Sequence, residues 1–260
     1  MQQVHTSMRG AQFNLKGKNV LITGAATGIG SSIVQVFSEC GANIGLHFNS
    51  SVNEAKKLEK RLRSNGNLKL FASDLTDFRM VQSLMDNFLK EFKTIDVLIN
   101  NAGGVLGAKN FLDLDEHAWD ETFALNVKSA FFLSREAFKK MKENEKGKII
   151  NISSVAAKFG GSDKSMHYGA AKAALESLTI GLSRYGAPYN ILVNCIRGGF
   201  INTDFHKKMG RSNSDIEKRI QMIPLKRAGQ PEDIASMAAY LASPCGDFIT
   251  GQIVSVTGGD

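Results

Sequence analysis

The most constraining feature of this chain is a regular alternation of short apolar β-type segments with longer helical patterns. The β-type segments lie at residues 19–23, 43–48, 68–72, 95–99, 148–152, 191–196 and 252–256. The helical patterns between them lie at residues 29–40, 56–63, 77–92, 115–142, 167–185 and 231–241. Strands that are joined by helices pair in parallel, and the helices then cover both faces of the sheet. The sequence therefore predicts an α/β protein with a doubly wound, seven-stranded parallel sheet.

Composition and length agree with one domain. The chain has 260 residues, of which 43% are hydrophobic and 22% are charged, as is ordinary for a globular protein. No change in composition divides it, so we expect an N-terminal extension at residues 1–17 and a single Rossmann-type domain at residues 18–260. The three cysteines form no metal-ligand motif, and no apolar stretch is long enough for a membrane helix. We expect a cytoplasmic protein with no metal site and no membrane contact.

The net charge of +7 raises the question of a nucleic-acid partner. The densest basic segment, residues 56–63, carries Leu58 and Leu62 at helical spacing, which is typical of an amphipathic helix with a solvated outer face. The aromatic and basic residues do not alternate as they do in an RNA-binding sheet. We therefore expect no nucleic-acid partner, and a steep salt dependence of RNA or DNA binding would contradict this.

A glycine-rich turn follows the first predicted strand. Gly24, Gly28 and Gly30 have the spacing Gly-x-x-x-Gly-x-Gly and directly precede a helical pattern. Glycines allow a tight turn and a close approach of the backbone to a pyrophosphate, and the helix N-terminus offers free N–H groups. The alternative is a tight turn without a ligand. The position between a strand and a helix favours a dinucleotide site.

A tyrosine and a lysine form the second candidate motif. Tyr168 and Lys172 lie four residues apart in a helical pattern, so both project from one helix face. A nearby ammonium favours the phenolate, so such a tyrosine can transfer a proton near neutral pH. A pair of this kind on a surface helix usually has no function. Ser154, however, follows a predicted strand at the edge where such sheets bind ligands, which favours a catalytic site.

Together these motifs resemble those of the short-chain dehydrogenase/reductase family. They occur in the family's order, at residues 23–30, Asp74, residues 100–103, Asn126, Ser154, Tyr168, Lys172 and Thr203. The resemblance extends over residues 18–259 and is nearest to bacterial 3-oxoacyl carrier-protein reductases. It implies hydride transfer between a nicotinamide cofactor and a carbonyl or secondary-alcohol carbon. It also implies a homotetramer.

The resemblance assigns roles to four side chains. Ser154 would hydrogen-bond the substrate oxygen, and Tyr168 would give or take the proton. Lys172 would lower the pKa of the tyrosine and hold the nicotinamide ribose. Asn126 would anchor a water relay that ends at Lys172. Ser153 is the alternative for the serine role, but Ser154 matches the family better.

The resemblance also implies a set of cofactor-binding residues. Asp74 would bind the adenine amino group, residues 101–103 would line the adenosine ribose, and Thr203 would hold the nicotinamide amide. The alternative role for Asp74 is in capping a helix. The full set is Gly24, Thr27, Gly28, Ile29, Gly30, Phe48, Asn49, Ser50, Asp74, Leu75, Asn101, Ala102, Gly103, Tyr168, Lys172, Ile201 and Thr203.

The end of the second strand bears on the choice between NAD and NADP. An NAD enzyme places an acidic residue there to bind the ribose 2′-hydroxyl. Here Phe48 is followed by Asn49, Ser50 and Ser51, so no carboxylate repels a 2′-phosphate. The glycine turn carries no arginine. We predict NADP(H) in preference to NAD(H).

Residues 200–227 resemble the substrate lid of the family. Between Asp204 and Arg227 they include seven Lys or Arg and three Asp or Glu, which suits an acidic substrate such as a CoA or acyl-carrier-protein thioester. The alternative is a solvated amphipathic helix. Gly198 stands where the family usually has proline, so we expect a more mobile lid.

The charge of the lid and the nearest resemblance make a 3-oxoacyl thioester one possible substrate, and sugar, steroid and small-ketone substrates stay open. A non-catalytic, cofactor-sensing protein is the alternative of another class.

Overall fold

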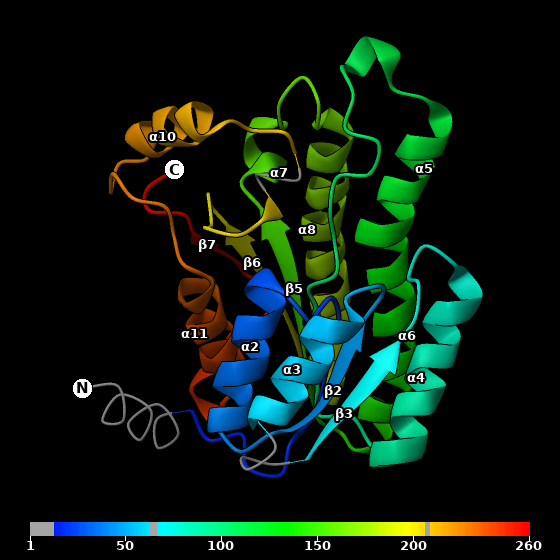
Figure 1. Ribbon diagram of the computed structural model, residues 1–260. Helices are drawn as coiled ribbons and strands as arrows, with labels where there is room; N and C mark the ends of the chain where they lie inside the picture. Colours follow the sequence, from blue (N-terminus) through cyan, green and yellow to red (C-terminus); the bar gives the residue numbers. More distant parts are fainter. Residues whose placement is uncertain (1–12, 63–66, 206–208) are drawn as a thin grey trace.

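The computed structural model describes residues 13–62, 67–205 and 209–260. The first twelve residues of the predicted extension, and residues 206–208 of the predicted lid, lie outside this part of the chain. The strands are β1 (Asn19–Ile22), β2 (Asn43–Phe48), β3 (Leu68–Ala72), β4 (Val97–Asn100), β5 (Gly147–Ser154), β6 (Ile191–Gly198) and β7 (Ile253–Val256). All adjacent pairs are parallel, in the order β3-β2-β1-β4-β5-β6-β7. The predicted seven-stranded, doubly wound sheet is confirmed (Figure 1).

Helices cover both faces of the sheet. They are α2 (Gly28–Glu39), α3 (Val52–Leu62), α4 (Phe78–Phe92), α5 (Glu116–Phe123), α6 (Ser129–Glu143), α7 (Ala156–Phe159), α8 (Met166–Gly186), α10 (Asn213–Met222) and α11 (Pro231–Ala242). Short turns of helix occur at η1 (Phe111–Asp113), η2 (Ala124–Lys128), η3 (Ala187–Tyr189) and η4 (Pro244–Gly246). No helix in the described part of the chain is long and apolar enough to cross a membrane.

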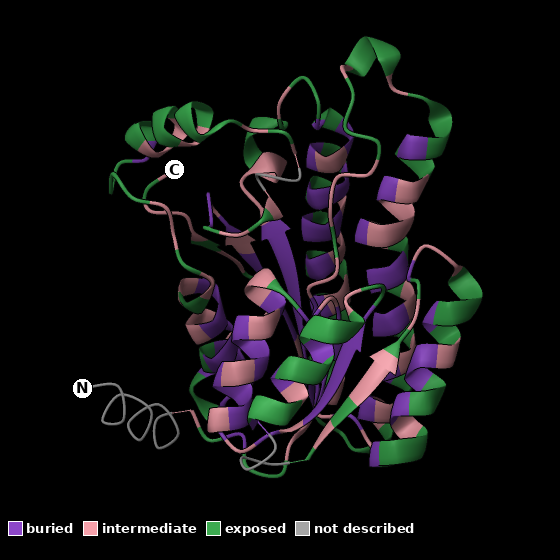
Figure 2. Cartoon of the chain, viewed as in Figure 1, coloured by how far each residue is buried: buried purple, intermediate pink, exposed green. Residues whose placement is uncertain are grey.

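The alternation of side chains along the strands produces two cores. Val20 and Ile22 of β1 pack in the first core, with residues of α2, α3 and α11. Leu21 packs in the second core, with residues of α4 and α6. Successive side chains of a strand point to opposite faces, so a buried parallel strand needs apolar residues at both kinds of position. Figure 2 shows the central strands as buried along their length.

The order of the strands reverses between β1 and β4. The chain builds β1, β2 and β3 toward one edge and then returns to build β4 to β7 toward the other. The carboxyl ends of β1 and β4 therefore lie side by side, and the segments that follow them diverge. Such a switch point is where sheets of this type bind ligands.

One predicted helix has a different form. The pattern at residues 115–142 predicts one helix, and the structure has α5 and α6 joined by the π-helical turn η2. A π turn inserts one extra residue into a helix and often marks a functional site. The insertion lies at Asn126, one of the predicted site residues.

The part of the predicted N-terminal extension that the structure describes, residues 13–17, packs against the domain. Leu15 is buried, and its backbone N–H donates to the carbonyl of Cys40 at 3.0 Å. The ring of Phe13 meets that of Tyr240 edge-on at 6.1 Å. These contacts join the segment before β1 to the ends of α2 and α11.

Candidate functional site

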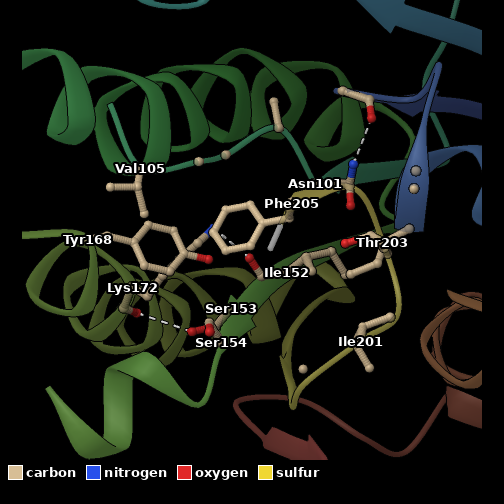
Figure 3. Close-up of a pocket in the computed structure, with 18 of the residues that line it drawn as sticks. Asn101, Val105, Ile152, Ser153, Ser154, Tyr168, Lys172, Ile201, Thr203 and Phe205 are labelled. Atoms are coloured by element: carbon tan, nitrogen blue, oxygen red, sulfur yellow. Dashed lines mark hydrogen bonds between the residues drawn. The ribbon is translucent and has the colours of Figure 1, made fainter. Parts of the chain in front are cut away.

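A pocket of about 650 Å³ opens at the carboxyl ends of the central strands. One end is lined by the glycine turn after β1, and the other by Ser154, Tyr168 and Lys172 (Figure 3). The loop after β4 and the start of the predicted lid form its sides. The structure thus brings the two motifs, which lie more than a hundred residues apart, into one cavity.

The glycine turn requires its glycines. Gly24 and Gly28 have φ angles of 60° and 54°, in the left-handed region that favours glycine. A Cβ on Gly30 would lie 2.2 Å from the carbonyl oxygen of Gly24, so no side chain fits there. The turn can therefore keep its close backbone packing only with glycine at these positions.

The N-terminus of α2 is open to the pocket. Its N-cap, Thr27, makes no side-chain capping bond, and the first turn carries no acidic residue. Gly28, Ile29 and Gly30 of that turn line the pocket. Unpaired N–H groups at a helix N-terminus favour phosphate. This end of the pocket fits the pyrophosphate of a dinucleotide.

The loop after β4 is bonded to the glycine turn. The hydroxyl of Thr23 accepts from the backbone N–H groups of Asn101 and Ala102, each at 3.0 Å. The Asn101 side-chain amide donates to the carbonyl of Gly24 at 2.9 Å (Figure 3). These bonds join the two segments at the switch point, and both segments line the pocket.

At the other end, three side chains from two elements converge. Tyr168 and Lys172 project from α8, and Ser154 ends β5. The Lys172 ammonium donates to the carbonyl of Ile152 at 2.8 Å and lies 5.6 Å from the centre of the Tyr168 ring. The neighbouring Ser153 instead donates its hydroxyl to Glu176 at 2.9 Å. Ser153 is thus already bonded to a carboxylate, which favours Ser154 in the serine role.

Burial shifts the titration of both α8 side chains. It raises the pKa of Tyr168 to about 12, although a hydrogen bond with Ser154 acts in the opposite direction. Burial also lowers the pKa of the Lys172 ammonium to about 8, and the charge of Glu176 opposes the shift. The resemblance implies that Lys172 lowers the pKa of Tyr168, whereas in the structure burial raises this pKa and the opposing effect comes from Ser154. At neutral pH Tyr168 carries its proton and Lys172 is mostly charged.

Asn126 lies behind the pocket wall and not on it. Its side-chain amide donates to the carbonyl of Gly104 at 2.8 Å and accepts from the N–H of Gly104 at 3.1 Å. A Cβ on Gly103 would lie 2.5 Å from the side-chain oxygen (Oδ1) of Asn126 and 2.8 Å from the Lys172 ammonium. Gly103 therefore lies between these two side chains, and the π turn η2 places Asn126 there.

Five of the predicted cofactor residues do not line the pocket. Phe48 and Leu75 are buried, while Asn49 and Ser50 are exposed at the end of β2. Asp74 accepts from the backbone N–H and the hydroxyl of Thr76, each at 2.9 Å. The N-cap of α4 is Asp77 and not Asp74. The other predicted cofactor residues, from Gly24 to Thr203, all line the pocket.

The structure also adds residues that sequence motifs did not indicate. Val105 and Ala108 line the pocket from the loop after β4, and Phe205 and Met209 line it from the predicted lid. The Phe205 ring lies 6.0 Å from the ring of Tyr168 (Figure 3). The only signal available for these residues was their position after a strand or within the predicted lid.

Comparison of the sequence with known proteins agrees with the site geometry. A family model described as "Enoyl-(Acyl carrier protein) reductase" matches residues 24–260. The chain is also similar to a 3-oxoacyl-[acyl-carrier-protein] reductase of Chlamydia trachomatis. The two are 35% identical over 247 residues, which are 94% of this chain and 98% of that protein.

Two solved structures have the same fold. A blue fluorescent protein from a metagenomic library, in complex with NADPH, is 31% identical with a TM-score of 0.87, covering 95% of this chain and 98% of that one. A 7α-hydroxysteroid dehydrogenase, complexed with NADH and 7-oxo glycochenodeoxycholic acid, is 33% identical with a TM-score of 0.88, covering 95% of each chain. These structures share a fold and differ in the cofactor that they bind.

Proposed function

Because this chain belongs to the short-chain dehydrogenase/reductase family of NAD(P)-dependent oxidoreductases, we propose that it transfers hydride between NADP(H) and a carbonyl or secondary-alcohol carbon. The single observation that carries this proposal is the convergence of Ser154, Tyr168 and Lys172 at one end of a pocket whose other end is the glycine turn. The residues that serve the reaction are Asn126, Ser154, Tyr168 and Lys172.

The proposed chemistry divides between cofactor and protein. The nicotinamide supplies or accepts the hydride when it is bound. In the reductive direction the Ser154 hydroxyl holds the carbonyl oxygen, and Tyr168 donates its proton to that oxygen. The raised pKa of Tyr168 suits this role, because the phenol is protonated at neutral pH. The Lys172 ammonium stabilises the phenolate that forms, and Asn126 keeps the segment beside Lys172 in place.

The preference for NADP(H) rests on the end of β2. Asn49 and Ser50 are exposed there and can donate to a 2′-phosphate. Phe48 precedes them, so no carboxylate stands at the position that NAD enzymes use for the ribose. A ratio of dissociation constants that favours NADH over NADPH would contradict this preference.

A 3-oxoacyl thioester is the substrate class that we favour. The Chlamydia relative acts on such a substrate, as its name says, and Val105, Ala108, Phe205 and Met209 give the pocket apolar walls that suit an acyl chain. In the described part of the lid, Arg227 pairs with Asp233 at 3.1 Å and Arg219 pairs with Asp260. These pairs reduce the positive charge that the lid offers to an acidic carrier. The apolar pocket walls therefore support this substrate class more strongly than the charge of the lid does.

The test is oxidation of NADPH and of NADH against a panel of carbonyl compounds, with Tyr168→Phe as the control. The panel contains acetoacetyl-CoA, other 3-oxoacyl thioesters, sugar ketones, steroid ketones and small diketones. We expect turnover of a thioester with NADPH that disappears in Tyr168→Phe. Turnover of another ketone would replace the substrate class and keep the reaction. Tight NADPH binding without turnover would favour a cofactor-sensing protein.

We further propose that residues 200–227 form the substrate lid and that the protein is a cytoplasmic homotetramer, as the family resemblance implies. Light scattering after size-exclusion chromatography tests the assembly. A mass near 28.3 kDa, that of a single chain, would contradict the tetramer.

A further inference from the structure

His47 is a buried side chain that lies next to the glycine turn and has no place in the proposed chemistry. It is 2% exposed and comes from the last part of β2. The backbone N–H of Gly24 donates to its Nδ1 at 3.2 Å, and its Nε2 lies 3.0 Å from the carbonyl oxygen of Ser73. Because Nδ1 accepts from an amide and Nε2 faces a carbonyl, the ring is neutral with its hydrogen on Nε2.

The surroundings of His47 keep it neutral. Burial lowers its pKa to about 4, while the bond to Ser73 and the charge of Asp74 oppose the shift. Among the residues that the structure describes, Asp74 is the charged group that interacts electrostatically with the His47 ring. The imidazole is therefore an acceptor toward Gly24 throughout the neutral pH range.

The peptide groups around Gly24 are held from two sides. On one side, the Asn101 side chain donates to the carbonyl of Gly24 at 2.9 Å. On the other side, the imidazole of His47 accepts from the Gly24 N–H, and the His47 carbonyl accepts from the N–H of Ala25 at 2.7 Å. Gly24 itself has a left-handed φ and lines the pocket. A small movement of this residue would move the turn that faces the pyrophosphate.

We propose that His47 is a positioning residue for the dinucleotide. Its imidazole accepts from Gly24 and so fixes the position of the glycine turn, while the bond of Nε2 to Ser73, in the loop after β3, orients the ring. This inference rests on the proposed binding of NAD(P) and does not depend on which substrate the protein uses. It requires an acceptor at the δ position, and the bond of Nε2 to Ser73 keeps the hydrogen on Nε2 so that Nδ1 is that acceptor.

Two variants separate the bonds. In His47→Asn, the amide oxygen can occupy the place of Nδ1 and accept from Gly24, while the bond to Ser73 is lost. In His47→Gln, the amide nitrogen can occupy the place of Nε2 and donate to Ser73, while the bond to Gly24 is lost. Both variants remove ring volume, and asparagine removes more than glutamine, so a loss caused by packing alone would be at least as large in His47→Asn as in His47→Gln. His117→Gln is the matched control, because the His117 side chain is 81% exposed.

The experiment measures NADPH and NADH dissociation constants by fluorescence titration of the full chain, together with hydrogen exchange of the Gly24 amide. We expect His47→Gln to weaken binding of the preferred cofactor about fivefold, as expected for the loss of one hydrogen bond, and to speed exchange at Gly24. His47→Asn and His117→Gln should stay within about twofold of the wild type. Unchanged binding in both His47 variants, or an equal loss in both, would overturn the proposal.

A measurement on the wild-type protein covers the case in which a variant does not fold. Long-range proton–nitrogen correlation spectra report which ring nitrogen of His47 carries the hydrogen. The proposal requires the hydrogen on Nε2 at neutral pH. A hydrogen on Nδ1, or a doubly protonated ring, would overturn it.

Discussion

At the scale of single residues, Gly103 leaves room for the side chains of Asn126 and Lys172 because it has no side chain of its own. A Cβ on Gly103 would lie 2.5 Å from Asn126 and 2.8 Å from the Lys172 ammonium, both too close for real contacts. We expect Gly103→Ala to displace Lys172 and to lower kcat at least about tenfold, because a catalytic group misplaced by 1 Å can cost about a hundredfold. Gly104→Ala is the matched control, since nothing lies within 4 Å of its Cβ. Equal activity of the two variants would contradict the placement of Lys172.

Gly198 and Gly199 form a second pair that differs in what a side chain would meet. A Cβ on Gly198 would lie 3.4 Å from Ile234, an ordinary contact, and no left-handed φ restricts the position. We expect Gly198→Ala to raise the free energy of unfolding by about 0.4–1 kcal/mol, because alanine restricts the unfolded chain. A Cβ on Gly199 would lie 2.7 Å from the Thr257 backbone, so Gly199→Ala should destabilise the protein. Urea unfolding of both variants measures the difference, and a destabilised Gly198→Ala would contradict it.

At the scale of elements, the buried Lys148 side chain joins β5 to the end of α11. The Lys148 ammonium donates to the carbonyls of Leu241 and Ser243 at 3.1 and 2.5 Å and pairs with Asp247 at 2.7 Å. These carbonyls lie at a helix C-terminus, where a cation satisfies groups that have no partner within the helix. Burial lowers the pKa of Lys148, and Asp247 opposes the shift.

We expect Lys148→Met to lower the free energy of unfolding by about 2–4 kcal/mol, because it leaves buried carbonyls without a donor. Lys69→Met is the control, since Lys69 and Glu91 form an exposed pair at 2.9 Å whose loss should cost less than about 1 kcal/mol. Urea unfolding at pH 7 measures both. A similar small effect in the two variants would show that Lys148 does not hold α11 in place.

The elements differ in how far the sequence could predict them. Periodicity predicts β2 and β3 with their observed bounds, β2 as a buried apolar run and the partly exposed β3 as a short β-rich run. It does not predict the π turn at Asn126, since one extra residue in a helix leaves the apolar pattern of α5 and α6 almost unchanged. The lining residue Val105 lies in a loop, whose conformation has no periodic signal. Tyr168 and Lys172 could be predicted because helical spacing alone puts them on one face.

At the scale of the whole molecule, parallel topology assembles the site. Gly24, Asn101 and Ser154 are far apart in sequence, but each follows or ends a strand, and all parallel strands end at the same edge of the sheet. His47 belongs to the same edge and is buried between the segments that meet there. Its titration is therefore coupled to folding of the entire domain, in addition to any effect on the cofactor.

This coupling gives the stability of the molecule a defined pH dependence. The pKa of His47 is about 4 in the folded protein and about 6.5 when unfolded, so between these values the unfolded chain binds the extra proton. Stability is then complete above pH 6.5 and is lost as the pH falls toward 4, by up to about 3 kcal/mol from this group. Urea unfolding at a series of pH values should show a shallower fall in His47→Gln than in the wild type. Parallel curves for the two proteins would show that His47 can take up its proton without unfolding.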